Sequence, residues 1–189
     1  MTDTARVAPG SRREVGPAVW AFSSIAGRVV GTGPPNLFMT LGRRRKLFWG
    51  WLRFARRLMP SGTLPRRETE MVILRVAELT GCDYERAHHL RLAKRSGLSD
   101  AQCASVALGS SAPEWTERER TLLATVEALI SHEDLNDSEW QACARFYDQA
   151  QLIELVLLVA HYRMLATGIR TLGIQTDQDR QAATRRITP

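Results

Sequence analysis

The sequence has few cysteines and no long apolar run, and both shortages narrow the class of protein. Its 189 residues include three cysteines, Cys82, Cys103 and Cys143. An odd and widely spaced set of cysteines argues against the disulfide framework of a small secreted domain. The longest uninterrupted apolar stretch, residues 155–160, is far shorter than the ~20 residues that span a bilayer. We therefore expect a soluble, cytoplasmic protein with no membrane partner.

The chain also lacks the motifs of nucleic-acid binding, although it is basic. Lys and Arg number 26 against 20 Asp and Glu, which gives a net charge of +6. Such a charge can attract nucleic acid or an anionic membrane. However, the basic residues occur in short, scattered runs, and no helix-turn-helix, zinc-finger or RNA-binding signature accompanies them. We expect them to lie on solvated helix faces and not to bind nucleic acid.

A third absence concerns β-structure, because no segment shows sustained alternation of apolar and polar residues. Apolar residues instead recur at helical spacing, and each run follows a helix cap and ends at glycine or proline. Helix starts are predicted by the capping pairs Thr80 with Asp83, Ser99 with Gln102 and Thr116 with Glu119, and by Asn136. The sequence predicts an all-α fold, an irregular bundle of about seven or eight helices. The last of these is expected over residues 151–167, ending at Gly168.

The expected organisation is one helical domain between two polar ends. Residues 1–14 are polar and contain Pro9-Gly10, which predicts a flexible N-terminal arm. Residues 15–175 are expected to form the domain, since a chain of this length is most simply one compact domain. Residues 176–189 are expected to be a polar C-terminal tail.

The residues that carry the most reactive side chains follow a helix predicted over residues 66–79, in which residues 71–74 are apolar on nearly all sides. In a helix that begins at residue 81, Cys82, Glu85 and His89 fall within an arc of roughly 60° on one face. Glu85 and His89 are one turn apart and can hydrogen-bond, and Glu70 can approach from the preceding helix. A carboxylate beside an imidazole suits general acid–base chemistry near neutral pH.

For several of these residues the sequence leaves a structural and a functional role open. Cys82 is either a reactive thiol near a helix N-terminus or a small buried residue. His88 points roughly 100° away from His89, towards a core or a subunit interface. Tyr84 is most simply a packed aromatic, and His161 a satisfied core histidine. Adjacent histidines do not share a helix face and no His-x-x-x-His occurs, so we expect no metal site.

Four motifs together resemble a known family. These are Leu-Pro-Arg-Arg-Glu-Thr-Glu at 64–70, the apolar segment that leads to Cys82, Tyr-Glu-x-Ala-His-His at 84–89, and Ala-x-x-x-Gly-Leu-Ser at 93–99. They resemble the carboxymuconolactone decarboxylase-like family, which includes the alkylhydroperoxidase D-like proteins, and the likeness extends loosely from about residue 35 to 173. It implies an all-α homo-oligomer, a trimer or hexamer, that acts on a small molecule without cofactor or metal.

The resemblance also implies which residues form the site. Alkylhydroperoxidase D-like members carry a glutamate, a Cys-x-x-Cys and a histidine four residues after the second cysteine, which here match Glu70, Cys82, Glu85 and His89. Glu85 replaces the second redox cysteine, so no disulfide can form between those two positions. The Tyr-Glu-x-Ala-His-His version resembles a subgroup without that cysteine, closer to the lactone decarboxylases. Supporting candidates are Tyr84 and His88.

Three functions follow as alternatives. The first is proton transfer by Glu70, Glu85 and His89 on a small lactone or keto acid, as in lactone decarboxylation. The second is a thiol-dependent peroxidase, in which Cys82 is oxidised and an external thiol resolves it. The third is a helical oligomer without catalysis that binds a ligand or a protein.

Overall fold

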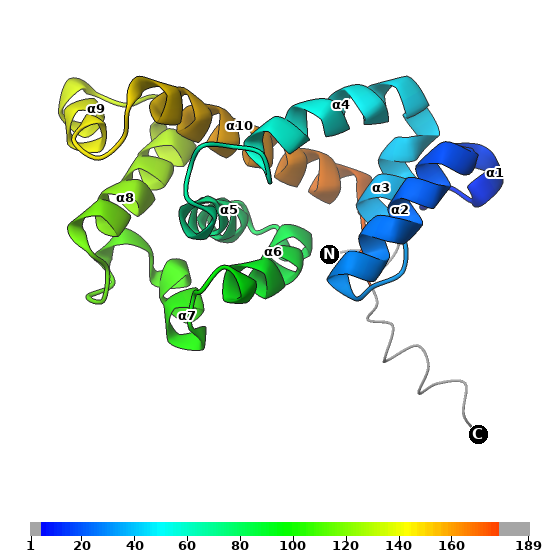
Figure 1. The fold of residues 1–189 in the computed structure, drawn as a ribbon, viewed down its shortest axis with the longest axis horizontal. Coiled ribbons are helices and arrows are strands. Elements are labelled where there is room, and N and C mark those ends of the chain that lie inside the picture. The colour runs from blue at the N-terminus through cyan, green and yellow to red at the C-terminus, as the bar shows by residue number, and fades with distance from the viewer. Residues whose placement is uncertain (1–4, 178–189) are drawn as a thin grey trace. The chain divides into compact units, whose positions relative to one another are not determined.

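The computed structural model describes residues 5–177, which form helices and loops and contain no β-strand (Figure 1). Eight α-helices of this part have seven or more residues, so the all-α prediction and the expected number of helices are confirmed. The described chain divides into two compact units, the first ending at Phe54 and resuming at Ile169, the second spanning Ala55–Gly168. This division differs from the single domain expected over residues 15–175.

The first unit has an apolar core of its own, which accounts for the division. It contains α1 Arg12–Val15, α2 Pro17–Val30, α3 Asn36–Leu41 and most of α4 Arg45–Leu58. Pro17 occupies the first turn of α2, and Gly31 ends that helix in the left-handed conformation. The buried core residues are Val15, Val19, Met39 and Phe48. Edge-to-face contacts join the ring of Phe48 to those of Phe22 and Phe38.

The N-terminal segment differs from the flexible arm that the sequence predicts. Residues 1–4 of that arm lie outside the described residues. The backbone amides of Arg6 and Val7 donate to the carbonyl of Leu172, and the amide of Gly10 donates to Met39. These bonds attach the segment to the first unit. Of the predicted tail, only residues 176 and 177 fall within the described residues.

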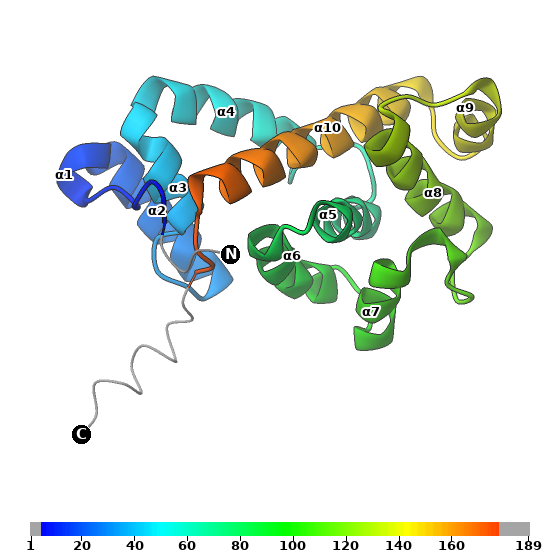
Figure 2. The ribbon, with the colours of Figure 1, turned by 180° about the vertical axis from the view of Figure 1, so that it is seen from behind.

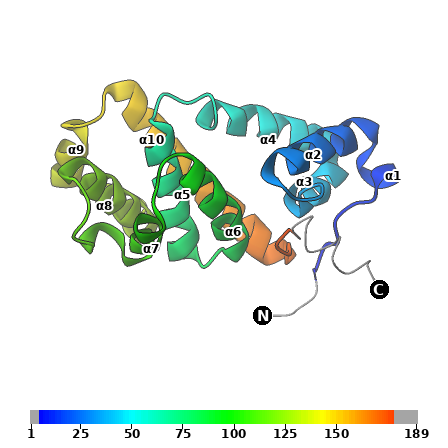
Figure 3. The same cartoon turned by 60° about the horizontal axis from the view of Figure 1, so that its bottom comes forward.

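The second unit is built around one helix that is buried over most of its length. Its helices are α5 Arg66–Thr80, α6 Asp83–Arg95, α7 Asp100–Leu108, α8 Glu117–His132, α9 Asp137–Ala144 and α10 Gln149–Leu172 as far as Gly168. Figures 1 and 2 show α5 in the middle of this unit, and Figure 3 shows α6 beside it. Residues 68–77 of α5 are all buried. The apolar part expected at residues 71–74 lies within this segment, and Glu68, Thr69, Glu70 and Arg75 are buried with it.

Most helix starts agree with the capping signals, and one does not. The boxes at Ser99, Thr116 and Asn136 begin α7, α8 and α9 as predicted. The start predicted at Thr80 is wrong, because Thr80 is the last residue of α5 and its hydroxyl donates to the carbonyl of Val76 at 2.7 Å. Gly81, with φ +61°, ends α5. Helix α6 therefore begins only at Asp83.

The end predicted for the last helix is also wrong. Helix α10 continues through Gly168 to Leu172 and is followed by Gly173, whose φ is +66°. A single glycine inside a helix costs only ~1 kcal/mol relative to alanine, which packing offsets. By length and composition α10 could cross a membrane, but half of its most apolar window is buried. One helix of this kind is weak evidence for a membrane span, because buried core helices pass the same test of length and composition.

Candidate active site

The imidazole of His89 lies between two carboxylates in the second unit. Its Nδ1 is 2.7 Å from Oε2 of Glu70, and its Nε2 is 3.3 Å from Oε2 of Glu85. Helix α6 carries His89 and Glu85 one turn apart, and the neighbouring α5 brings Glu70 to the other ring nitrogen. All three side chains are buried. We call this arrangement the Glu70–His89–Glu85 triad, and it unites the three residues predicted to lie together.

The two carboxylates keep His89 protonated. Burial by itself lowers the pKa of this imidazole, but hydrogen bonding to Glu70 and Glu85 and the charges of both groups outweigh it. The net effect raises the pKa of His89 from 6.5 to about 9. At neutral pH His89 is therefore an imidazolium that donates from both nitrogens.

A fourth charged group completes the charge balance. Arg66 precedes Glu70 by one turn of α5, and its Nη2 lies 2.6 Å from Oε1 of Glu70. Buried ions are tolerated when they are paired, and two cations here face two carboxylates. In contrast, Oε1 of Glu85 is buried and accepts no hydrogen bond from the described residues. A buried carboxylate oxygen without a donor would be stabilised by a proton or by a ligand donor.

Tyr162 of α10 closes one side of the triad. Its ring meets the imidazole of His89 edge to face, with 5.2 Å between the centroids and an interplanar angle of 90°. Its hydroxyl lies 3.8 Å from Sδ of Met59. Burial raises the pKa of Tyr162 well above its ordinary value, and the charges of Glu85 and Glu70 act in the same direction. Tyr162 is therefore a neutral phenol beside the charged groups.

The other predicted site residues, Cys82, Tyr84 and His88, belong to α6 or its N-cap, the helix that carries His89 and Glu85. Cys82 is buried at the N-cap position of α6, and its side chain caps no amide of that helix. Tyr84 is buried one residue after the start of the same helix. The ring of His88 contacts the ring of His89, with 5.2 Å between the centroids. Burial, with the charges of His89 and Arg91, lowers the pKa of His88 to about 3, so this imidazole is neutral.

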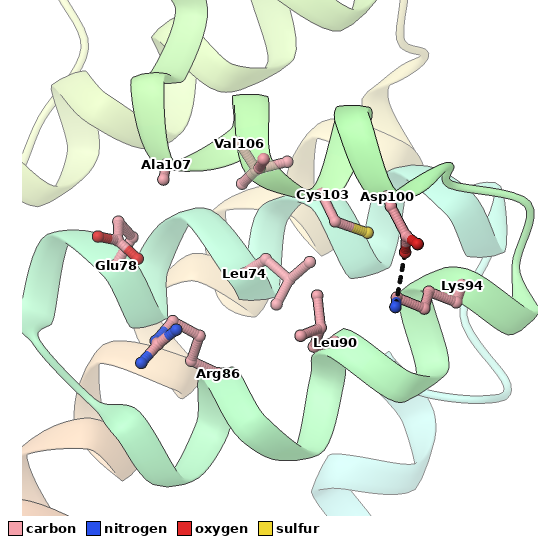
Figure 4. A pocket seen from close by; sticks show the side chains of 10 residues that line it. Leu74, Glu78, Arg86, Leu90, Lys94, Asp100, Cys103, Val106 and Ala107 are labelled. Atoms are coloured by element: carbon pink, nitrogen blue, oxygen red, sulfur yellow. Dashed lines mark ion pairs between the residues drawn. The ribbon is translucent and has the colours of Figure 1, made fainter.

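Cys103 lines a separate pocket of about 350 Å³ that lies on a different face of α6 (Figure 4). Arg86, Leu90 and Lys94 of α6 border it, and Lys94 is paired there with Asp100 at 2.6 Å. None of the predicted site residues lines this pocket.

Within residues 5–177, no group of three or more His, Cys, Asp or Glu side chains is arranged to hold a metal ion.

Sequence reasoning missed Arg66 and Tyr162. Arg66 stands four residues before Glu70, and this spacing brings side chains together on a helix. That signal was available. Tyr162 follows His161 in an apolar helix, where a buried tyrosine needs a partner for its polar tip. The neighbouring His161 is buried, and this burial lowers its pKa to about 4 and leaves it neutral.

The comparisons with known proteins agree with this fold. Residues 45–128 match the profile described as "Carboxymuconolactone decarboxylase family". This part of the chain, which includes α5 and α6, belongs to that family. The chain matches no curated protein sequence. The finer assignment to the Tyr-Glu-x-Ala-His-His subgroup stays a prediction.

Three solved structures show the same fold at low identity. The debrominase Bmp8, as a cysteine-to-alanine variant in complex with 2,3,4-tribromopyrrole, has TM-score 0.80 and 18% identity, and covers 100% of both chains. A peroxidase-related protein from Ralstonia eutropha JMP134, described as an alkylhydroperoxidase AhpD core, has TM-score 0.78 and 16% identity over 90% of this chain and 92% of that chain. A peroxidase-related protein from Silicibacter sp. TM1040 has TM-score 0.81 and 11% identity over 94% and 95%.

Proposed function

We propose that the protein is an enzyme that moves a proton at a carbon next to a carbonyl group, using the Glu70–His89–Glu85 triad. The substrate class is a small lactone or keto acid, in keeping with the family of residues 45–128. The observation that carries the proposal is the buried Oε1 of Glu85, which accepts no hydrogen bond from the described residues.

Each member of the triad has a separate task in this mechanism. Glu85 takes the proton through Oε1, while the His89 imidazolium remains bound to its other oxygen. Glu70 holds His89 in place from the opposite nitrogen, and the imidazolium charge stabilises the carboxylate and the enolate that forms. In a decarboxylation Glu85 instead takes the proton of the substrate's carboxyl group, the C–C bond to that carboxylate breaks, and carbon dioxide leaves as the enolate forms. Glu85 then returns the same proton to the enolate carbon.

The test is turnover of a panel of lactones and β-keto acids, followed as substrate loss and carbon dioxide release. Wild type should convert at least one compound, and Glu85→Gln should lower kcat by roughly 10²–10⁴-fold, the usual contribution of a general base. Cys82→Ser should retain most of the activity. If no compound is converted while the triad variants lose assembly, the protein is instead a non-catalytic helical oligomer.

A second candidate is thiol chemistry at Cys82. The structure supports it by placing the buried Cys82 at the N-terminus of α6, three residues before Glu85. In addition, the debrominase structure with bound 2,3,4-tribromopyrrole carries a cysteine-to-alanine substitution. In a peroxidase reaction the Cys82 thiolate attacks a hydroperoxide oxygen, which gives a sulfenic acid and an alcohol. Two external thiols then restore Cys82 and leave as a disulfide with water.

A further inference from the structure

One long segment of the chain is free of acidic residues. Between Val15 and Arg67 the sequence contains no Asp or Glu, although it is rich in Arg and Lys. The segment includes α2, α3 and α4. Charge of one sign over such a length gives the surface that it covers a positive potential.

Helix α4 concentrates this charge on its solvent side. Phe48 is fully buried in the core of the first unit, and at ~100° per residue Lys46 and Arg53 lie on the opposite side of the helix. Both are exposed, and neither forms an ion pair with a described residue. By contrast Arg43, just before the helix, is paired with Glu14.

Apolar side chains flank these two cations. Leu47 is 62% exposed on one flank of α4, and Trp49 is 38% exposed on the other. The indole of Trp49 is held in place by an edge-to-face contact with Phe22 of α2, at 5.7 Å between centroids. Ile25 and Val29 follow Phe22 at helical spacing on α2 and are 60% and 64% exposed. We call the exposed side chains of Ile25, Val29, Lys46, Leu47, Trp49 and Arg53 the basic-apolar face.

We propose that the basic-apolar face docks the first unit onto the surface of an anionic phospholipid bilayer. Lys46 and Arg53 would pair with lipid phosphates, and Trp49 has the amphipathic ring that favours the headgroup region. Leu47 and the aliphatic residues of α2 would reach the acyl boundary. A nucleic acid could pair with the cations through its phosphates, but it has no apolar layer that these aliphatic side chains could enter. The proposal departs from our expectation that the protein has no membrane partner.

The test is co-sedimentation of the full chain with lipid vesicles. Vesicles of phosphatidylglycerol and phosphatidylcholine in equal parts should bind the protein, and added salt should weaken the binding. Vesicles of phosphatidylcholine alone should bind it poorly. The double variant Lys46→Glu with Arg53→Glu should lower partitioning by about 10-fold or more. Leu47→Ser with Trp49→Ser should lower it as well, without any change of charge.

A matched control separates this surface from net charge. Arg145→Glu with Arg163→Glu makes the same change of charge at an exposed and a partly exposed position of the second unit and should bind nearly as well as wild type. Equal binding to both kinds of vesicle, or equal loss in the control, would overturn the proposal. So would retention of a DNA duplex, or self-association of the protein, that depends on Lys46 and Arg53 without vesicle binding. Circular dichroism of each variant shows whether it is folded.

Discussion

Nδ1 of His89 lies 2.7 Å from Oε2 of Glu70, a residue nineteen positions earlier on the preceding helix. Glu85 meets the other nitrogen of the same ring from within α6. A buried imidazolium between two carboxylates is therefore the central feature of the second unit. The free energy of unfolding, the NMR titration of His89 and the proposed catalysis should therefore all change when one of these three residues is replaced.

The stability of the protein should fall as the pH rises from about 6.5 to 9. The folded-state pKa of His89 is about 9 against 6.5 in the unfolded chain, so the folded protein binds the extra proton in this window. The stabilisation is complete below pH 6.5 and is lost as the pH passes through the folded pKa, with a total of roughly 2–4 kcal/mol. Urea unfolding at several pH values measures it.

His89→Gln is the matched variant for that measurement and should remove the slope. Burial lowers the pKa of His88 to about 3 and of His161 to about 4, so both are already neutral across the window. A slope of equal size in the variant would show that His89 is not its source.

Glu70→Gln should lower the pKa of His89 by roughly one unit or more, because the hydrogen bond and the charge of Glu70 favour the imidazolium. Titration of the histidine ring signals by NMR follows this directly. Glu117→Gln is the control, since Glu117 is an exposed carboxylate paired with Arg145 in another part of the second unit. An unchanged His89 pKa in Glu70→Gln would contradict the geometry of the triad.

The reaction of the thiols with a small hydroperoxide separates the two proposed functions. If proton transfer is the function, Cys82 should be oxidised no faster than Cys103, which is partly exposed. Mass spectrometry of the modified peptides gives both rates in one sample. Rapid oxidation confined to Cys82, and slowed in His89→Ala, would favour the thiol-dependent peroxidase.

A buried network beside α5 should contribute to stability without a role in catalysis. The hydroxyl of Tyr147 donates to Oε2 of Glu68 at 2.9 Å, and Arg118 binds both oxygens of the same carboxylate. Tyr147→Phe removes a hydrogen bond to a charged acceptor, so the free energy of unfolding should drop by about 1.5–3 kcal/mol.

Arg163→Ala, at an exposed ion pair with Glu133, is the control for Tyr147→Phe. It should cost less than ~1 kcal/mol in urea unfolding. A cost of Tyr147→Phe as small as this control would show that the network carries little stability.

The helices whose starts carry side-chain signals were predictable from the sequence. Ser99 and Thr116 each begin a helix with a capping box, because the signal and the contact lie within four residues. Thr80 has the same pattern but belongs to the end of α5, since its hydroxyl bonds back to Val76. Gly168 resembles a stop but is held inside α10. Local signals alone could not decide between such outcomes.

The part of the site whose contacts lie within one helical turn was also predictable from the sequence. The pair Glu85 and His89 follows from helical spacing, and the approach of Glu70 was expected from the order of the helices and from the family resemblance. Tyr162 reaches His89 from a helix far along the chain, and no local pattern predicts such a contact. The division into two units could not be predicted from the sequence either, because it depends on how Phe48 and its neighbours pack in three dimensions.

The most direct test of the central claim is deuterium incorporation from heavy water at the carbon next to the carbonyl, measured by mass spectrometry on the panel of lactones and β-keto acids. Wild type should exchange this hydrogen in at least one compound, and Glu85→Gln should lower the rate by roughly 10²–10⁴-fold. The Arg145→Glu, Arg163→Glu control should exchange as wild type does. Absence of exchange in wild type, or an equal rate in Glu85→Gln, would contradict proton transfer by the triad.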